Sequence, residues 1–147
     1  MRYLLKILRS KLFISASQAV IGIVFIFASL DKIANPGDFA VAIVNYKIIP
    51  LSLVNIFAIV IPWLELFCGI LILFGEYIKE SSFIISSLLL VFVVMIAAAV
   101  FRNLDIDCGC FGTLDAQKVG LTKIAENILL LLLSVNIFYA PFTKVRK

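Results

Sequence analysis

The chain has 147 residues, of which 63% are hydrophobic and 15% charged, and its mean hydropathy is +1.16. This composition excludes an ordinary soluble domain and is typical of a chain that resides in a lipid bilayer. The net charge of +4 comes largely from basic residues near the two ends of the chain, which indicates a membrane protein and not a nucleic-acid-binding protein. The absence of histidine excludes Ser-His and Cys-His nucleophilic mechanisms.

Four apolar runs are long enough to cross a membrane, at about residues 14–33, 51–74, 83–101 and 122–140. A helix of about 20 residues spans a hydrocarbon core about 30 Å thick. Because backbone amides in lipid must be hydrogen-bonded within the segment, we expect all four runs to be helices. The first run is too long for the core of a signal peptide, so we expect it to be retained. The sequence therefore predicts a single all-α membrane domain, folded as a four-helix transmembrane bundle.

The distribution of positive charge predicts how this bundle lies in the membrane. An even number of spans puts both termini on one side, and of the 13 Lys and Arg residues eight lie on that side and five on the other. The positive-inside rule then predicts cytoplasmic termini in the cytoplasmic (inner) membrane of a bacterium. The loop at about residues 102–121 is expected outside the cytoplasm.

Two polar breaks carry helix signals. After the first run, Asn35–Gly37 is a turn signal, and we expect a short helix over Phe39–Tyr46 with Asp38 as its N-cap. This segment holds too few apolar residues to span the bilayer, so it is expected at the outer interface. Before the third run, Ser81 or Ser82 is expected to cap the helix.

The outer loop contains the string Cys108-Gly109-Cys110-Phe111-Gly112. Residues two apart in an extended or turned segment have Cα atoms about 5.5–7 Å apart, which overlaps the range of about 4.4–6.8 Å that a disulfide accepts. Gly109 relieves the backbone of the small ring. A strained disulfide is easily reduced. A disulfide that closes so short a loop also adds little stability, so the spacing favours a role in thiol–disulfide exchange over a structural role. Phe111 and Gly112 are expected to shape the loop and shield the thiols.

Three interpretations of the cysteine pair stay open: a structural bridge or idle thiols, a pair that cycles between dithiol and disulfide, and a copper(I) site. We predict no zinc site, because two thiolates are too few for tetrahedral zinc and the chain has no histidine. Thiolate formation needs nearby positive charge, for which Arg102, Lys118 and Lys123 are the candidates.

Glu65 lies in the middle of the second run, where a carboxylate is costly unless it is paired or protonated, so we expect it to face the bundle interior. Lys32, near the outer end of the first run, is its expected partner. The two form either a packing pair without chemistry or a site at which Glu65 handles a proton. Cys68 shares a helical face with Glu65 and is expected to be a packing residue. Glu126 and Asn127 are expected in the first turn of the last helix, in a capping and interfacial role.

Several segments carry a resemblance to a known group: Phe25-x-Phe27-Ala28-Ser29-x-x-Lys32, Tyr46-x-x-x-Pro50, Pro62-x-x-Glu65-x-x-x-Gly69 and Cys108-Gly109-Cys110-Phe111-Gly112. On these segments the chain resembles the MauE/DoxX group of small four-helix bacterial membrane proteins. The Cys-Gly-Cys-Phe-Gly string is the specific part. The group often has an Arg-Asn or Arg-Asp pair early in the last span, where this chain has Glu126-Asn127, so any role of that arginine does not carry over.

The resemblance implies a redox-associated membrane protein. MauE is linked with methylamine dehydrogenase maturation, DoxX-type proteins with thiosulfate:quinone oxidoreduction, and vitamin K epoxide reductase-like proteins of similar architecture pass electrons between thioredoxin-like partners and quinone. We therefore predict thiol–disulfide exchange by Cys108 and Cys110 with an extracytoplasmic thioredoxin-like or maturing redox protein, with quinone as the candidate cofactor and Glu65 handling the proton. The alternatives are a non-enzymatic assembly subunit that docks a maturation factor and, third, a small-solute or metal transporter.

Overall fold

The computed structural model describes residues 10–104, 106 and 120–140. This part of the chain is all-helical, with α2 (Lys11–Ala34), α3 (Pro36–Asn45), α4 (Leu51–Phe74), α5 (Ile78–Phe101) and α6 (Leu121–Tyr139). All of these except α3 are long and apolar enough to cross a membrane. The expected all-α bundle of four spans, with a short helix after the first, is therefore confirmed.

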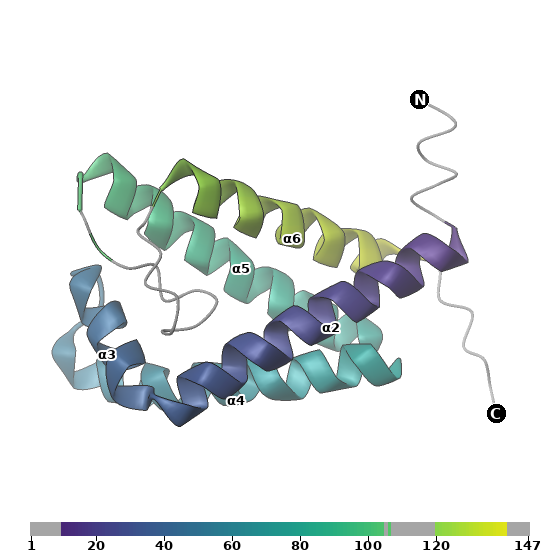
Figure 1. Ribbon diagram of the computed structural model, residues 1–147, viewed down its shortest axis with the longest axis horizontal. Helices are drawn as coiled ribbons and strands as arrows, with labels where there is room; N and C mark the ends of the chain where they lie inside the picture. Colours follow the sequence, from purple (N-terminus) through teal and green to yellow (C-terminus); the bar gives the residue numbers. More distant parts are fainter. Residues whose placement is uncertain (1–9, 105, 107–119, 141–147) are drawn as a thin grey trace.

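The four long helices run alternately in opposite directions (Figure 1). Helix α2 packs extensively against α4, and α5 packs extensively against α6. Contacts of α4 with α5 and of α2 with α6 join the two pairs, and these contacts are less extensive. The first and last spans thus meet along a looser seam than the one that joins α2 to α4.

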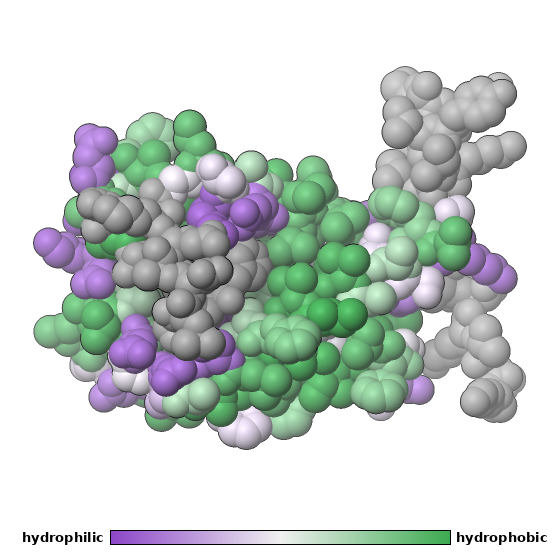
Figure 2. All heavy atoms as spheres, viewed as in Figure 1, coloured by the Kyte–Doolittle hydropathy of each residue, from purple (hydrophilic) through white to green (hydrophobic). Residues whose placement is uncertain are grey.

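The outer surface of the bundle is apolar. Large hydrophobic side chains are exposed on each long helix, for example Phe27, Phe67, Val94 and Leu132. Figure 2 shows hydrophobic residues over much of the visible face, with most of the hydrophilic residues at the end where α3 lies and a few at the opposite end. Soluble monomers rarely expose apolar surface so continuously. The chain is a multi-pass membrane protein whose surroundings are a lipid bilayer.

Helix α3 begins earlier than the sequence predicts. It starts at Pro36, with Asn35 at the N-cap, and Asp38 lies in its first turn. The expected Asp38 cap was wrong because proline, which lacks an N–H, suits the first helical position, where that group has no partner within the helix. Phe39 and Ile43 are buried against Val54 and Ala58 of α4. Helix α3 therefore folds back onto the first half of α4.

The start of α5 also differs from the prediction. The helix begins at Ile78, so Ser81 and Ser82 lie inside it, buried, instead of capping it. Ser134 of α6 donates its hydroxyl to the Ser82 carbonyl at 3.0 Å, and Ser86 donates to the Ser134 hydroxyl at 2.9 Å. These serines join α5 to α6 and fix the register between them.

Helices α2 and α4 approach each other closely where Gly22 faces Gly69. A Cβ on Gly22 would lie 3.0 Å from the Gly69 carbonyl oxygen and 3.0 Å from Leu73 Cβ. A Cβ on Gly69 would lie 3.2 Å from the Gly22 carbonyl oxygen. Because backbone atoms cannot rotate aside as side chains do, a larger residue at either position pushes the two helices apart. Small residues at helix contacts are the usual means of tight packing in membranes.

We therefore expect Gly22→Leu to destabilise the bundle by about 1–3 kcal/mol, the usual cost of overpacking. Thermal unfolding of the detergent-solubilised protein, followed by circular dichroism, measures this loss. Gly37→Ala is the control, because a Cβ there meets nothing within 4 Å; it should change stability by less than about 0.5 kcal/mol. Equal melting temperatures for the two variants would contradict the close approach of α2 and α4.

Candidate functional site: a buried ion pair and its surroundings

A fully buried ion pair joins α2 to α4. Lys32 Nζ donates to both carboxylate oxygens of Glu65, each at 2.9 Å. The side chains are 0% and 1% exposed. The structure thus brings together the two residues that the sequence suggested as partners.

Two aromatic rings complete the surroundings of Lys32. Its ammonium nitrogen lies 5.0 Å from the ring centroid of Phe39 on α3 and 5.0 Å from that of Phe92 on α5. A cation over an aromatic face is attracted by the ring quadrupole, more strongly where water is excluded. Four helices therefore converge on one charged group. These two phenylalanines could not be assigned to the site from the sequence, because thirteen phenylalanines are spread along the chain and nothing in their spacing distinguishes these two.

The pair enters the interior without net charge. Burying either ion alone would cost several kcal/mol, and the partner's charge together with good hydrogen-bond geometry offsets that cost. The carboxylate accepts two hydrogen bonds from a single ammonium group, which holds both partners in place. Chemically, this arrangement keeps a carboxylate available as a proton acceptor in a region from which bulk water is excluded.

Asn127 is a further buried polar residue close to the depth of this pair. It is 0% exposed, its Nδ2 donates to the Lys123 carbonyl, and its Oδ1 has no hydrogen-bond partner among the described residues. It lies two turns before Ser134, and the serine contacts between α5 and α6 therefore put it level with the part of α5 that contains Phe92.

The expected capping role of Asn127 was wrong. Helix α6 begins at Leu121, so Glu126 and Asn127 lie in its second turn. Helical periodicity then turns Asn127 inward and leaves Glu126 partly exposed, where Lys123 Nζ contacts its Oε2 at 2.7 Å. An asparagine one residue after a surface ion pair, within an apolar run, was the signal that could have identified it.

Arg102 ties the end of α5 to the end of α3. Its Nη1 donates to the Tyr46 carbonyl oxygen at 3.0 Å, next to the last residue of α3. A cation at a helix C-terminus is favourable because the last carbonyls carry partial negative charge. Tyr46 itself is buried, and burial raises its pKa to about 12, so its hydroxyl stays protonated at physiological pH. The contact holds the residue that follows α5 against the end of α3.

The cysteine string lies outside the described residues. This holds for Cys108, Gly109, Cys110, Phe111 and Gly112. Its flanks are described: α5 ends at Phe101 and α6 begins at Leu121, at the same end of the bundle as α3. The third cysteine, Cys68, is a buried free thiol within the apolar core formed by α2, α4, α5 and α6, which agrees with the packing role expected for it. No cluster of three metal-ligating side chains occurs among the residues that the structure describes.

Comparison with known proteins identifies the family. Residues 10–140, which include the ion pair, Arg102 and the cysteine string, match the family described as "Methylamine utilisation protein MauE". The chain belongs to the MauE family. The resemblance to DoxX-type proteins and the role of the cysteine string stay predictions.

Three curated MauE family members are similar to this chain. The proteins of Methylophilus methylotrophus, Paracoccus denitrificans and Methylorubrum extorquens are 28%, 26% and 29% identical over 123, 123 and 101 residues. The alignments cover 82%, 83% and 68% of this chain, but 65%, 66% and 54% of the relatives. The chain therefore spans less than two thirds of the length of each of these relatives. No solved structure matches it.

The ion pair yields a test by paired substitution. Lys32→Met or Glu65→Leu alone leaves one buried charge without its partner and should cost about 3–5 kcal/mol of stability. The double variant Lys32→Met/Glu65→Leu removes both charges and should lose much less than the sum of the two single losses. Unfolding of the solubilised protein measures all three. If the double variant is as unstable as the two losses added together, the residues do not act as a pair.

Proposed function

We propose that this MauE family member carries out thiol–disulfide exchange at the extracytoplasmic face of the bacterial inner membrane, through Cys108 and Cys110. The observation that carries the proposal is the position of the cysteine string in the sequence, between the end of α5 and the start of α6. The string lies in the loop between α5 and α6, whose first residue, Arg102, is fixed to the end of α3. An exchange site needs accessible thiols attached to a rigid support, and this end of the bundle supplies the support.

The chemistry of the string supports a cycling pair. A ring closed by two cysteines with a single residue between them is strained, and a strained disulfide has a higher reduction potential than a structural one. The bundle does not need this bridge for its stability, because its described helices are already held by the Lys32–Glu65 pair, the serine contacts and the glycine contact.

Closing the disulfide from the dithiol releases two electrons and two protons, and these need acceptors. A quinone, when bound, would accept both electrons and both protons. The residues that suit such a group lie on α2 and α6, where an apolar groove ends at the Lys123–Glu126 pair. Glu65 would hold a proton on a carboxylate oxygen, and Lys32 keeps that carboxylate oriented until the proton arrives.

The distribution of Lys and Arg between the two sides of the membrane supports the proposed orientation of the bundle. The side that holds both termini carries eight of the 13 Lys and Arg residues, so we place that side in the cytoplasm and the cysteine string outside. The names of the relatives tie them to methylamine utilisation. We propose that the partner is an exported redox protein or a thioredoxin-like protein of such a pathway, whose cysteines this chain oxidises or isomerises.

Trapping of a mixed disulfide tests the exchange. Purified protein in lipid nanodiscs, oxidised and then mixed with reduced thioredoxin that lacks its resolving cysteine, should form a covalent complex visible on a non-reducing gel. Cys108→Ser/Cys110→Ser should lose the complex entirely. Cys68→Ser should retain it, because that thiol is buried in the core. A complex that survives in the double variant would refute the proposed cysteine role.

Thiol labelling of intact cells tests the orientation. In a Cys68→Ser background, a membrane-impermeant maleimide should label Cys108 and Cys110 from outside after mild reduction. Labelling that appears only after permeabilisation would reverse the proposed orientation. A Cys108→Ser/Cys110→Ser protein that still supports maturation of its partner would favour the non-enzymatic assembly role.

A further inference from the structure

A groove runs along the seam between the first and last spans. It has a volume of about 490 Å³, within the range of about 300–1,000 Å³ that is usual for small-molecule sites. Six of its eight lining residues are apolar, and the two polar ones are an ion pair. The lining comes from α2 and α6 alone: Ile23, Val24, Phe27, Ala28, Lys123, Glu126, Leu129 and Leu130.

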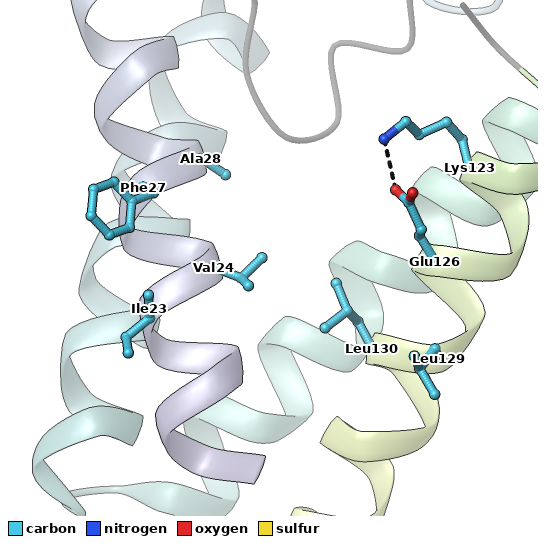
Figure 3. Close-up of a pocket in the computed structure, with 8 residues that line it drawn as sticks. All are labelled: Ile23, Val24, Phe27, Ala28, Lys123, Glu126, Leu129 and Leu130. Carbon is cyan, nitrogen blue, oxygen red and sulfur yellow. Dashed lines mark hydrogen bonds and ion pairs between the residues drawn. The ribbon is translucent and has the colours of Figure 1, made fainter. Parts of the chain in front are cut away.

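Figure 3 shows how the groove is built. Val24 and Ala28 of α2 and Leu130 of α6 point into the space between the two helices. Lys123 and Glu126 lie at one end, on the first two turns of α6. Their contact of 2.7 Å puts a hydrogen-bond donor and an acceptor side by side at the end of an otherwise apolar groove.

The groove is open to the hydrocarbon of the membrane. Phe27 on one rim is 70% exposed and Leu129 on the other is 59% exposed. Exposed apolar residues at these positions of transmembrane helices face lipid. A ligand that reaches the groove therefore comes sideways from the bilayer, and its body must be apolar.

We propose that the groove binds an uncharged, membrane-soluble amphiphile, whose small polar head lies at Lys123–Glu126 and whose apolar tail lies along Val24 and Leu130. The two charges at the polar end disfavour lipids whose heads carry a net charge. An anionic phospholipid head would meet the Glu126 carboxylate, and a cationic head would meet the Lys123 ammonium. A head without net charge fits the pair if it accepts a hydrogen bond from Lys123 or donates one to Glu126. Quinones, whose carbonyl oxygens accept, and quinols, whose hydroxyls donate and accept, are membrane compounds of this class when they carry isoprenoid tails.

This inference extends the proposed function, since it gives the electron acceptor a binding site, but it is tested by binding alone. Trp63 on α4 is the one tryptophan of the chain, and it does not line the groove. In a Trp63→Phe/Phe27→Trp protein the fluorescent group stands at the groove rim instead. The probe is decylubiquinone, titrated into the protein in nanodiscs of phosphatidylcholine, because quinones quench indole fluorescence on contact.

We expect saturable quenching at position 27 and weak, non-saturating quenching at Trp63 in the unaltered protein. Val24→Phe, or Leu130→Phe on the opposite wall, fills the groove and should weaken the saturable component at least about tenfold. Val94→Phe on α5 is the matched control, since Val94 is 59% exposed and does not line the groove; it should leave binding unchanged. The binding result of a variant is used only if its melting temperature equals that of the control variant within experimental error. Equal, non-saturating quenching at both positions would overturn the proposal.

Competition separates a quinone-type head from a phospholipid. Excess phosphatidylglycerol should not displace the probe from the protein with Glu126, but should compete in Glu126→Gln, because the negative charge that repels an anionic head is removed there. Displacement by phosphatidylglycerol from the unaltered groove would make it a phospholipid site and refute the inference. Cys108→Ser/Cys110→Ser should bind the probe with unchanged affinity. Loss of exchange with retained binding therefore contradicts only the cysteine proposal, and loss of binding with retained exchange contradicts only this one.

Discussion

The contact of Lys32 with Glu65 is the constraint on which the rest of the bundle depends. Lipid offers no water to either charge, so each must find the other inside the protein. That requirement fixes how far α2 and α4 slide past one another, and the glycine contact between Gly22 and Gly69 brings them close enough for the two groups to meet. The rings of Phe39 and Phe92 then bring α3 and α5 to the same point.

The same constraint explains how much the sequence could predict. The four spans follow from the length of their apolar runs, because a backbone in hydrocarbon has few alternatives to a helix. The partner of Glu65 could be inferred because so few charged residues lie within the spans. An unpaired charge costs more free energy in lipid than in water. The ion pair could therefore be predicted from the sequence more easily than the packing around it.

Features that depend on small energies were harder to predict. The start of α3 is decided by Pro36 at the first helical position and not by the cap at Asp38. Ser81 and Ser82 lie buried inside α5 because packing between helices outweighs a cap worth about 1 kcal/mol. Asn127 points inward because α6 begins at Leu121 and thereby sets the phase of its faces. The groove between α2 and α6 depends on the distance between two spans far apart in the sequence, which no local pattern records.

The position of the two charges along the chain also bears on how the protein is made. Glu65 follows Lys32 by 33 residues, so at about 5–20 residues per second the ribosome adds it about 2–7 s later. During that interval Lys32 lacks Glu65, its partner in the folded bundle. Lys32 lies two residues before the end of α2 and has a long aliphatic stem, so its ammonium group can reach the headgroup region before Glu65 is made. Glu65 lies deep in α4 and has a shorter side chain, so its carboxylate cannot reach the headgroup region in this way. The order of synthesis therefore suits the pair. Lys32, whose charge can stay near the headgroups, is made first, and Glu65, whose charge cannot, finds Lys32 already present when it is made.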